Sequence, residues 1–355
     1  MIQEARRFLQ SFSVNNEGPA ESTQVCRPGI THGTRPFCDN ARYCLQSSPT
    51  GNTLMAFDLS DKLVIGISSR ALFDLEAENT IYEQQGVSAY ADYQHAREDE
   101  PLARGTAFPL VSALLHLNDL VPGRQFVEVV LMSRNTPDTG LRVFNSIEHY
   151  NLPITRAAFS GGQGIAPYLQ SFKVDLFLSK DAGDVQNAVD AGVAAATLYA
   201  PPEANHAQSE QIRIAFDGDA VLFSPESEQI FKEQGLDAFQ AHEEAHRFES
   251  MQAGPFAKLL ILLGNLQKQF PAERCPVRIA IVTARSSPAH ARVVHTLRNW
   301  GVSVDEAFFL GGVAKDEVLS AFRAHIFFDD QDAHLRSASR LVPSGKVPYK
   351  GGSLA

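Results

Sequence analysis

Cysteine is scarce in this sequence, and a long hydrophobic run is absent. Four cysteines in 355 residues are too few for a disulfide scaffold, so a reducing cytoplasm is the expected compartment. No apolar run is long enough to cross a bilayer, and the first twenty residues are too polar for a secretory signal. The net charge of −10 argues against a general affinity for nucleic acid or anionic membranes, although a phosphate compound can still bind at a local cationic or metal site.

Periodic patterning is also absent from residues 1–60, where Gly, Pro, Ser, Thr and Asn are scattered. This composition predicts a loosely structured N-terminal extension. Cys26, His32, Cys38 and Cys44 lie in it, but they lack the closely spaced C-x2-C pairs that are typical of zinc sites. We therefore favour a loop with incidental thiols over a zinc site.

Beyond this extension the chain repeats itself. Residues 127–133 and 277–283 are both apolar runs that end in a hydroxyl residue, and they lie 150 positions apart. Upstream, residues 81–90 match residues 230–239 at an offset of 149. A period near 150 residues indicates a duplicated domain rather than a solenoid. An ordered series of such matches with one single-residue slip is not readily produced by chance.

Each copy alternates apolar strands with helical patterns. The predicted strands are residues 63–67, 126–132 and 176–178 in the first copy, and residues 212–216, 277–282 and 326–328 in the second. This alternation predicts an α/β fold with parallel sheets covered by helices on both faces. We expect two tandem Rossmann-like halves, an N-terminal half (residues 61–205) and a C-terminal half (residues 206–355). Ligands of such sheets bind outside the carboxyl ends of the strands.

Four polar motifs of the C-terminal half fall at these strand ends or at a helix start. They are Asp217-Gly-Asp219, Thr283, Lys315 and Asp329-Asp330. Each motif alone is common, because Asp-Gly-Asp is a frequent turn sequence and a lone lysine is usually a solvated surface group. Their ordered combination along one α/β unit favours a catalytic site.

These residue types suit an attack on a phosphate monoester. Two like charges about 4 Å apart cost on the order of 4 kcal/mol at an effective dielectric near 20, so a carboxylate nucleophile needs a divalent cation. Oxygen ligands from Asp217, Asp330 and a backbone carbonyl suit Mg²⁺. Asp217 can then form an aspartyl-phosphate, while Asp219 protonates the leaving alkoxide and later deprotonates the attacking water. Thr283 and Lys315 can hold the non-bridging oxygens.

The order of the motifs resembles that of the haloacid dehalogenase-like phosphatases. Longer strings resemble the cytosolic 5'-nucleotidases of type I, and they are residues 67–73, 82–86, 215–228, 282–286 and 327–331. The resemblance covers roughly residues 60–350. It implies Mg²⁺-dependent hydrolysis of nucleoside 5'-monophosphates, often AMP, to nucleoside and phosphate.

The resemblance also implies roles for the single residues. It makes Asp217 the nucleophile and Asp219 the acid and base, both at the metal site. It assigns phosphate binding to Thr283 and Lys315. It completes the metal site with Asp330, for which the neighbouring Asp329 is an alternative or a helper.

The N-terminal half has lost most of these groups at the matching positions. Ser68 and Arg70 replace Asp217 and Asp219, Ile165 replaces Lys315, Lys180 replaces Asp330, and only the hydroxyl of Thr283 is kept, by Ser133. We therefore expect no hydrolysis in this half. Arg70 and Lys180, with Ser68 and Ser133, can instead bind an anion without metal, such as a regulatory nucleotide. A structural ion pair of Arg70 is an equal alternative.

Helical inserts are expected after each first motif, at residues 76–105 and 226–254. The second insert, from about residue 224, is predicted to cap the catalytic pocket and to help select the substrate. His242 and His246 could bind a metal, but Glu243 and Glu244 between them favour a solvated helix face. The aromatics of this insert could include a base-stacking ring, although most aromatics in such a pattern are core residues, and they are Phe231, Phe239, Phe248 and Phe256.

Two other functions remain open at this level. A phosphatase for sugar phosphates or other small phosphomonoesters would use the same groups, and a nucleotide-binding regulator would need only part of them. The intact motifs of the C-terminal half argue against the regulator. The base preference and the oligomeric state, a homo-oligomer included, do not follow from the sequence.

Overall fold

The computed structural model describes residues 57–202 and 211–352. Almost all of the predicted N-terminal extension, with Cys26, His32, Cys38 and Cys44, lies outside the described residues. None of the helices in the described ranges is long and apolar enough to span a membrane.

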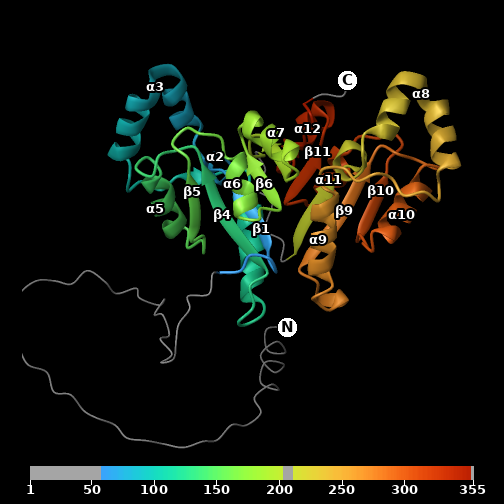
Figure 1. The fold of residues 1–355 in the computed structure, drawn as a ribbon, viewed down its shortest axis with the longest axis horizontal. Helices are drawn as coiled ribbons and strands as arrows, with labels where there is room; N and C mark the ends of the chain where they lie inside the picture. The colour runs from blue at the N-terminus through green and yellow to red at the C-terminus, as the bar shows by residue number, and fades with distance from the viewer. Residues whose placement is uncertain (1–56, 203–210, 353–355) are drawn as a thin grey trace, which may run out of the picture. The chain divides into compact units, whose positions relative to one another are not determined.

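Ten strands form one sheet in the order β10-β9-β8-β11-β12-β7-β6-β1-β4-β5 (Figure 1). The strands are β1 (Leu63–Ile67), β4 (Val127–Ser133), β5 (Arg156–Phe159), β6 (Leu176–Ser179), β7 (Ala194–Leu198), β8 (Ile212–Phe216), β9 (Val277–Thr283), β10 (Glu306–Phe309), β11 (Ile326–Asp329) and β12 (Ser344–Lys346). Every neighbouring pair is parallel except β7 and β12. The predicted α/β class is confirmed, but the strands form a single sheet, because this antiparallel pair joins its two parts.

Three predicted strands continue one residue further than expected. Ser133, Thr283 and Asp329 are the last residues of β4, β9 and β11, whereas the sequence placed them just after the strands. The carboxyl ends of these parallel strands point to one edge of the sheet, so the side chains at their ends are brought to that edge.

Helices cover both faces of this sheet. They are α2 (Ser69–Leu72), α3 (Glu76–Ala96), α4 (Phe108–His116), α5 (Leu141–His149), α6 (Ala166–Ser171), α7 (Ala182–Asp190), α8 (Glu226–Ala245), α9 (Ala257–Gln267), α10 (His290–Asn299), α11 (Asp316–Phe322) and α12 (Asp332–Ala338). The strands β1 and β4 are buried along their whole length, as expected for a sheet covered on both sides.

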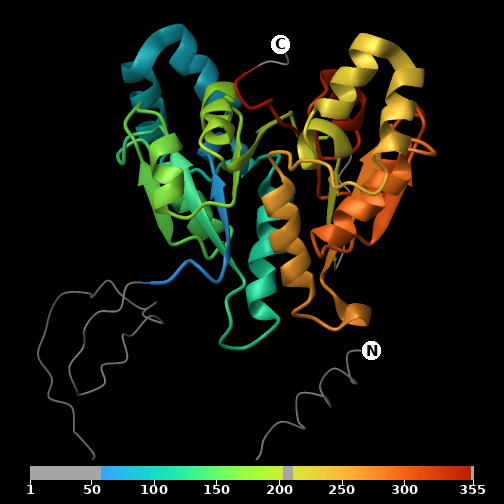
Figure 2. The same cartoon turned by 45° about the vertical axis from the view of Figure 1, so that its right-hand side comes forward.

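The hydrophobic core differs between the two faces of the sheet. On one face a continuous cluster joins α4, α9 and their strands, and it includes Ile65 of β1 and Ile214 of β8. Because successive strand residues point to opposite faces, Val64 and Ala215 belong to two separate clusters on the other face. Figure 2 shows α4 and α9 beside each other.

The helices α3 and α8 rise beyond the carboxyl ends of the strands (Figure 1). Each is kinked at a glycine with φ of 84°, Gly86 in α3 and Gly235 in α8. Glycine is favoured there because a side chain would strain this left-handed backbone. The predicted inserts, residues 76–105 and 226–254, are helical only as far as Ala96 and Ala245.

Gly254 closes the loop between α8 and α9 against the backbone. A Cβ atom on this residue would lie 2.5 Å from the carbonyl oxygen of Phe223 and 2.6 Å from that of Val221. Gly164 has no atom within 4 Å of the same position and is a matched control. Gly254→Ala should lower the free energy of unfolding in urea by about 2 kcal/mol, because backbone must move. Gly164→Ala should change it by less than about 0.5 kcal/mol, and equal effects would contradict this packing.

Candidate active site

Asp217 directly follows β8 at the carboxyl edge of the sheet. Its backbone N–H donates to the carbonyl of Phe328 in β11, over 2.8 Å, which ties it to the neighbouring strand. The chain then makes a tight turn through Gly218–Leu222, in which Ala220 has φ of 60°. A non-glycine residue in this left-handed conformation is held only where the surroundings impose it. The turn thus places Asp217 and Asp219 at the carboxyl edge of the sheet.

Lys315, immediately before α11, joins two buried carboxylates. Its Nζ lies 2.9 Å from Oδ1 of Asp217 and 2.7 Å from Oδ2 of Asp329. Burial opposes the charge of Lys315, but the two carboxylates outweigh it and raise the pKa of the ammonium group. Burial also raises the pKa of Asp217 above its usual range, although Lys315 opposes this effect.

Asp330 has a buried oxygen without a partner. Tyr349 donates its hydroxyl to Oδ2 of this residue, whereas Oδ1 has no hydrogen-bond partner within the described part of the chain. Burial raises the pKa of Asp330 to about 8, and the charges of Asp217 and Asp329 add to this shift. An unsatisfied buried carboxylate oxygen among other carboxylates is a position that a bound cation would stabilise.

Asp329, the last residue of β11, and the following Asp330 differ in their surroundings. Asp329 accepts hydrogen bonds from Lys315 and, over 2.8 Å, from the backbone of Gln331. Nδ1 of His334 lies 3.1 Å from its Oδ2. Asp217, Asp329 and His334 offer ligand atoms within 4.8 Å of one another, so this buried group can hold a metal ion.

Arg285 holds Asp219 by two hydrogen bonds. Its Nε donates to Oδ2 over 2.8 Å and its Nη2 to Oδ1 over 2.6 Å. The guanidinium is almost fully buried, and the carboxylates of Asp219 and Glu243 raise its pKa although burial opposes this. Such a two-point contact fixes both the position and the orientation of a carboxylate.

Glu243 of α8 continues this network into the cap. It accepts hydrogen bonds from Arg285, from Arg292 over 3.0 Å and from the hydroxyl of Ser227 over 2.7 Å. The prediction that Glu243 lies on a solvated face was wrong, because these buried donors draw it inward. The neighbouring His242 contacts Arg292 and belongs to no metal-ligand group within residues 57–202 and 211–352.

Thr283 packs against the turn that carries the aspartates. Its Oγ1 lies 3.3 Å from the position that a Cβ atom of Gly218 would take, and it accepts the backbone N–H of Arg285. Thr283, Asp217, Lys315 and Asp330 are all buried at this edge of the sheet. The structure therefore brings together the groups that the sequence singled out in the C-terminal half.

The matching groups of the N-terminal half form a different arrangement. Ser68 caps α2 by accepting the N–H of Ala71, and Ser133 contacts the hydroxyl of Ser69 over 3.2 Å. Nη2 of Arg70 and Nζ of Lys180 both contact Glu76, over 3.1 Å and 2.9 Å. The ion pair considered for Arg70 is thus present, and it includes Lys180.

The sequence reasoning missed Arg285 and Glu243, although the repeat contained a signal for them. At the offsets of 150 and 149 they match Asn135 and Gln94, so both charges are lost where Asp219 becomes Arg70. The three differences fit together, because Arg285 contacts both Asp219 and Glu243, and none of the three charges is present at the matching positions of the N-terminal half.

Comparisons with known proteins bear on this site. A family model described as 5'-nucleotidase matches residues 55–353. The human protein Cytosolic 5'-nucleotidase 1B, from Homo sapiens, is 41% identical over 289 residues, which cover 79% of this chain and 47% of that protein. The chain thus spans about half the length of this curated relative.

Solved structures add little to this. A Pnkp1/Rnl/Hen1 complex aligns with 82% of this chain and 97% of its own at 9% identity, with a TM-score of 0.28. Histidinol dehydrogenase from Elizabethkingia anophelis aligns with 81% of this chain and 53% of its own at 9% identity, with a TM-score of 0.20. Scores this low carry no argument about fold or function. The match of the family model over nearly all described residues, together with the human relative, shows that this chain belongs to the 5'-nucleotidase family.

Proposed function

We propose that this chain hydrolyses nucleoside 5'-monophosphates, AMP among them, to nucleoside and phosphate, with Mg²⁺ as cofactor. The observation that carries the proposal is the buried contact of Asp217 with Lys315, beside the unpartnered oxygen of Asp330. A carboxylate at a strand end, next to a cation and to a carboxylate with one unpartnered oxygen, suits attack on a dianionic phosphate. Membership of the 5'-nucleotidase family supports this substrate class.

The metal would be held by Asp217 and Asp330, with the turn that carries Asp219 beside them. Bound Mg²⁺ supplies positive charge that offsets repulsion between the phosphate and the carboxylates. Asp329 is less suited as a direct ligand, because its oxygens already contact Lys315, Gln331 and His334. We assign Asp329 the role of holding Lys315 in place.

In the proposed reaction an oxygen of Asp217 attacks phosphorus and forms an aspartyl-phosphate. Asp219 gives a proton to the departing nucleoside oxygen and then takes one from the water that hydrolyses the intermediate. Thr283 and Lys315 bind the non-bridging oxygens of the phosphate. Arg285 positions Asp219 for both proton transfers, and Glu243 holds Arg285 from the cap helix.

We also propose that the chain consists of two duplicated halves, residues 61–205 and 206–355, of which only the second is catalytic. Corresponding hydrogen bonds support this. Nε of Arg142 donates to the carbonyl of Glu100, and Nε of Arg292 donates to that of Glu249. The expectation that most of the four cap aromatics are core residues was wrong, because only Phe256 is buried, whereas Phe231 and Phe248 are exposed. The guanidinium carbon of Arg285 lies 5.4 Å from the ring centroid of Phe239. We expect Phe239 to face the base.

Phosphate release from a panel of phosphomonoesters tests the function. AMP and other nucleoside 5'-monophosphates should be turned over faster than sugar phosphates of similar size. Asp217→Asn should lower this rate by at least about a thousandfold, because the amide is a poor nucleophile, while the fold is kept. Faster turnover of sugar phosphates would overturn the substrate assignment, and full activity of Asp217→Asn would overturn the nucleophile assignment.

The metal dependence tests the role of Asp330. Chelation should abolish phosphate release, and added Mg²⁺ should restore it. Asp330→Asn should raise the Mg²⁺ concentration for half-maximal activity at least about tenfold, because one anionic ligand is lost. Asp332→Asn changes a nearby half-buried aspartate whose oxygens contact Tyr199 and Lys346, and it is the control, for which no change is expected. The same Mg²⁺ requirement in both variants would contradict the assignment.

Glu243→Gln tests the proposed positioning of Asp219. The variant introduces the residue that the N-terminal half carries at the matching position, Gln94. It should lower kcat for AMP by about tenfold and change KM by less than about twofold, because the cap helix no longer holds Arg285 electrostatically.

Glu244→Gln changes the exposed neighbour and is the matched control. Should Glu243→Gln fail to fold, Arg285→Lys keeps the charge but removes the two-point contact with Asp219. An unchanged kcat in the folded variant, or the same loss in Glu244→Gln, would argue for a purely structural network.

A further inference from the structure

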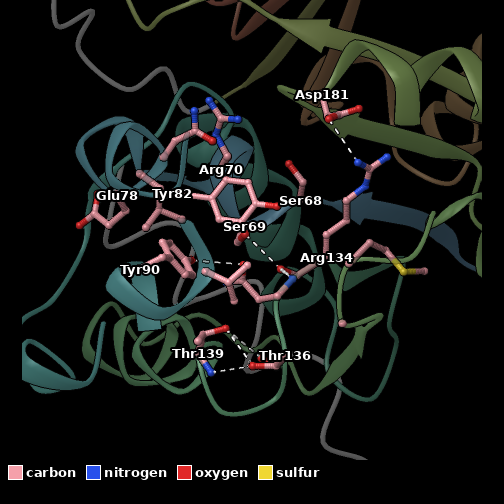
Figure 3. A pocket seen from close by; sticks show the side chains of 18 of the residues that line it. Ser68, Ser69, Arg70, Glu78, Tyr82, Tyr90, Arg134, Thr136, Thr139 and Asp181 are labelled. Atoms are coloured by element: carbon pink, nitrogen blue, oxygen red, sulfur yellow. Dashed lines mark hydrogen bonds and ion pairs between the residues drawn. The ribbon is translucent and has the colours of Figure 1, made fainter. Parts of the chain in front are cut away.

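A cavity lies in the N-terminal half, at the carboxyl edge of its strands and beneath the kinked helix α3 (Figure 3). Its volume is about 490 Å³, within the usual range for small-molecule sites. The residues Ser68, Ser69 and Arg70 line it where the C-terminal half carries its catalytic turn. The cavity therefore corresponds in position to the candidate active site, but it lacks the nucleophile.

The charges around this cavity disfavour a phosphate. Its lining contains four carboxylates, those of Glu78, Asp138, Asp181 and Asp184, and the two guanidinium groups of Arg70 and Arg134. Two of these carboxylates contact residues outside the lining, since Glu78 pairs with Arg142 over 2.8 Å and Asp138 contacts His95 over 2.9 Å. Arg134 contacts Asp184 over 2.5 Å and Asp181 over 3.6 Å, and the contact with Asp181 is visible in Figure 3.

The other cations nearby are also compensated. Arg70 and Lys180 share the carboxylate of Glu76, a residue whose position is taken by Pro225 in the C-terminal half. A dianionic ligand would have to separate these ion pairs, which would leave their carboxylates uncompensated beside it. The anion expected from the sequence would thus meet no cation that lacks a carboxylate partner among the lining residues.

Two tyrosines provide a surface for a flat ring. Tyr82 and Tyr90 lie on α3 with ring centroids 5.9 Å apart and nearly perpendicular planes. Tyr82 is 50% exposed although it lines the cavity, so part of its ring is free to contact a ligand. Val87 and Leu75 extend this apolar wall. Planar heterocycles are commonly held by such aromatic faces and edges.

Two buried hydrogen-bond donors of this lining lack partners. Nδ2 of Asn135 and Nε of Arg70 are buried and find no hydrogen-bond partner in the described ranges. Both are donors, so each would be satisfied by a ring nitrogen or carbonyl of a ligand. Asp181 is partly exposed and offers a carboxylate acceptor, which is the group that commonly binds ribose hydroxyls.

We propose that this cavity binds an uncharged nucleoside and does not hydrolyse anything. The base would contact Tyr82 and accept a hydrogen bond from Asn135, and the sugar hydroxyls would donate to Asp181. The corresponding nucleotide is disfavoured, because the cations of the lining already contact carboxylates. A nucleoside is also the product of the proposed reaction, so this site would respond to product; that link alone depends on the proposed function.

Isothermal titration of adenosine into the full chain tests the site without turnover. The wild-type chain should bind adenosine, and Tyr82→Ala should weaken binding at least about tenfold, because an aromatic contact with a base is lost. Phe231 is the matched control, since it is 49% exposed and forms the corresponding edge contact with Phe239 in α8. Phe231→Ala should keep the wild-type affinity for adenosine.

AMP titrated into Asp217→Asn, with and without Tyr82→Ala, separates nucleoside from nucleotide. We expect the same AMP affinity in both. Weaker AMP binding with Tyr82→Ala would show a nucleotide site and overturn the proposal. No adenosine binding by the wild-type chain, or a loss only in Phe231→Ala, would overturn it as well. Should Tyr82→Ala not fold, Asn135→Ala removes the unpartnered donor and should also weaken adenosine binding at least about tenfold.

Discussion

A buried cation between two buried carboxylates is the constraint on which the candidate site depends. Lys315 can remain charged in the interior only because Asp217 and Asp329 both contact it. Removing one partner of such a group typically costs about 3–5 kcal/mol, because the remaining charge is left without compensation. The negative charges of Asp217 and Asp329 also act on Asp330 and raise its pKa, and a divalent cation at this position would favour its charged form.

The sheet makes this cluster possible. Asp217, Thr283 and Asp329 come from three neighbouring strands, β8, β9 and β11, whose carboxyl ends meet at one edge. Apolar residues fill both faces of these strands, so the polar side chains have no other place than the strand ends. The hydrophobic core thus determines where the charged groups gather, although it takes no part in the chemistry.

The two halves of the chain use the same edge in different ways. In the C-terminal half the charges are arranged around carboxylates, with Arg285 between Asp219 and Glu243. In the N-terminal half the matching positions carry cations, and Glu76 compensates them. The N-terminal half has a cavity at this edge, and both cations among its lining residues, Arg70 and Arg134, already contact carboxylates.

The sequence by itself determined the α/β class, the positions of the main strands and the order of the motifs, because apolar periodicity and turn residues are local signals. The tertiary structure decided that the strands form one sheet, through the antiparallel pairing of β7 and β12. It also decided which charges pair. Glu243 reads as a surface residue in its local context, but Arg285 and Arg292, 42 and 49 positions away, draw it inside. Such pairings depend on distances between residues far apart in the chain, which no local pattern contains.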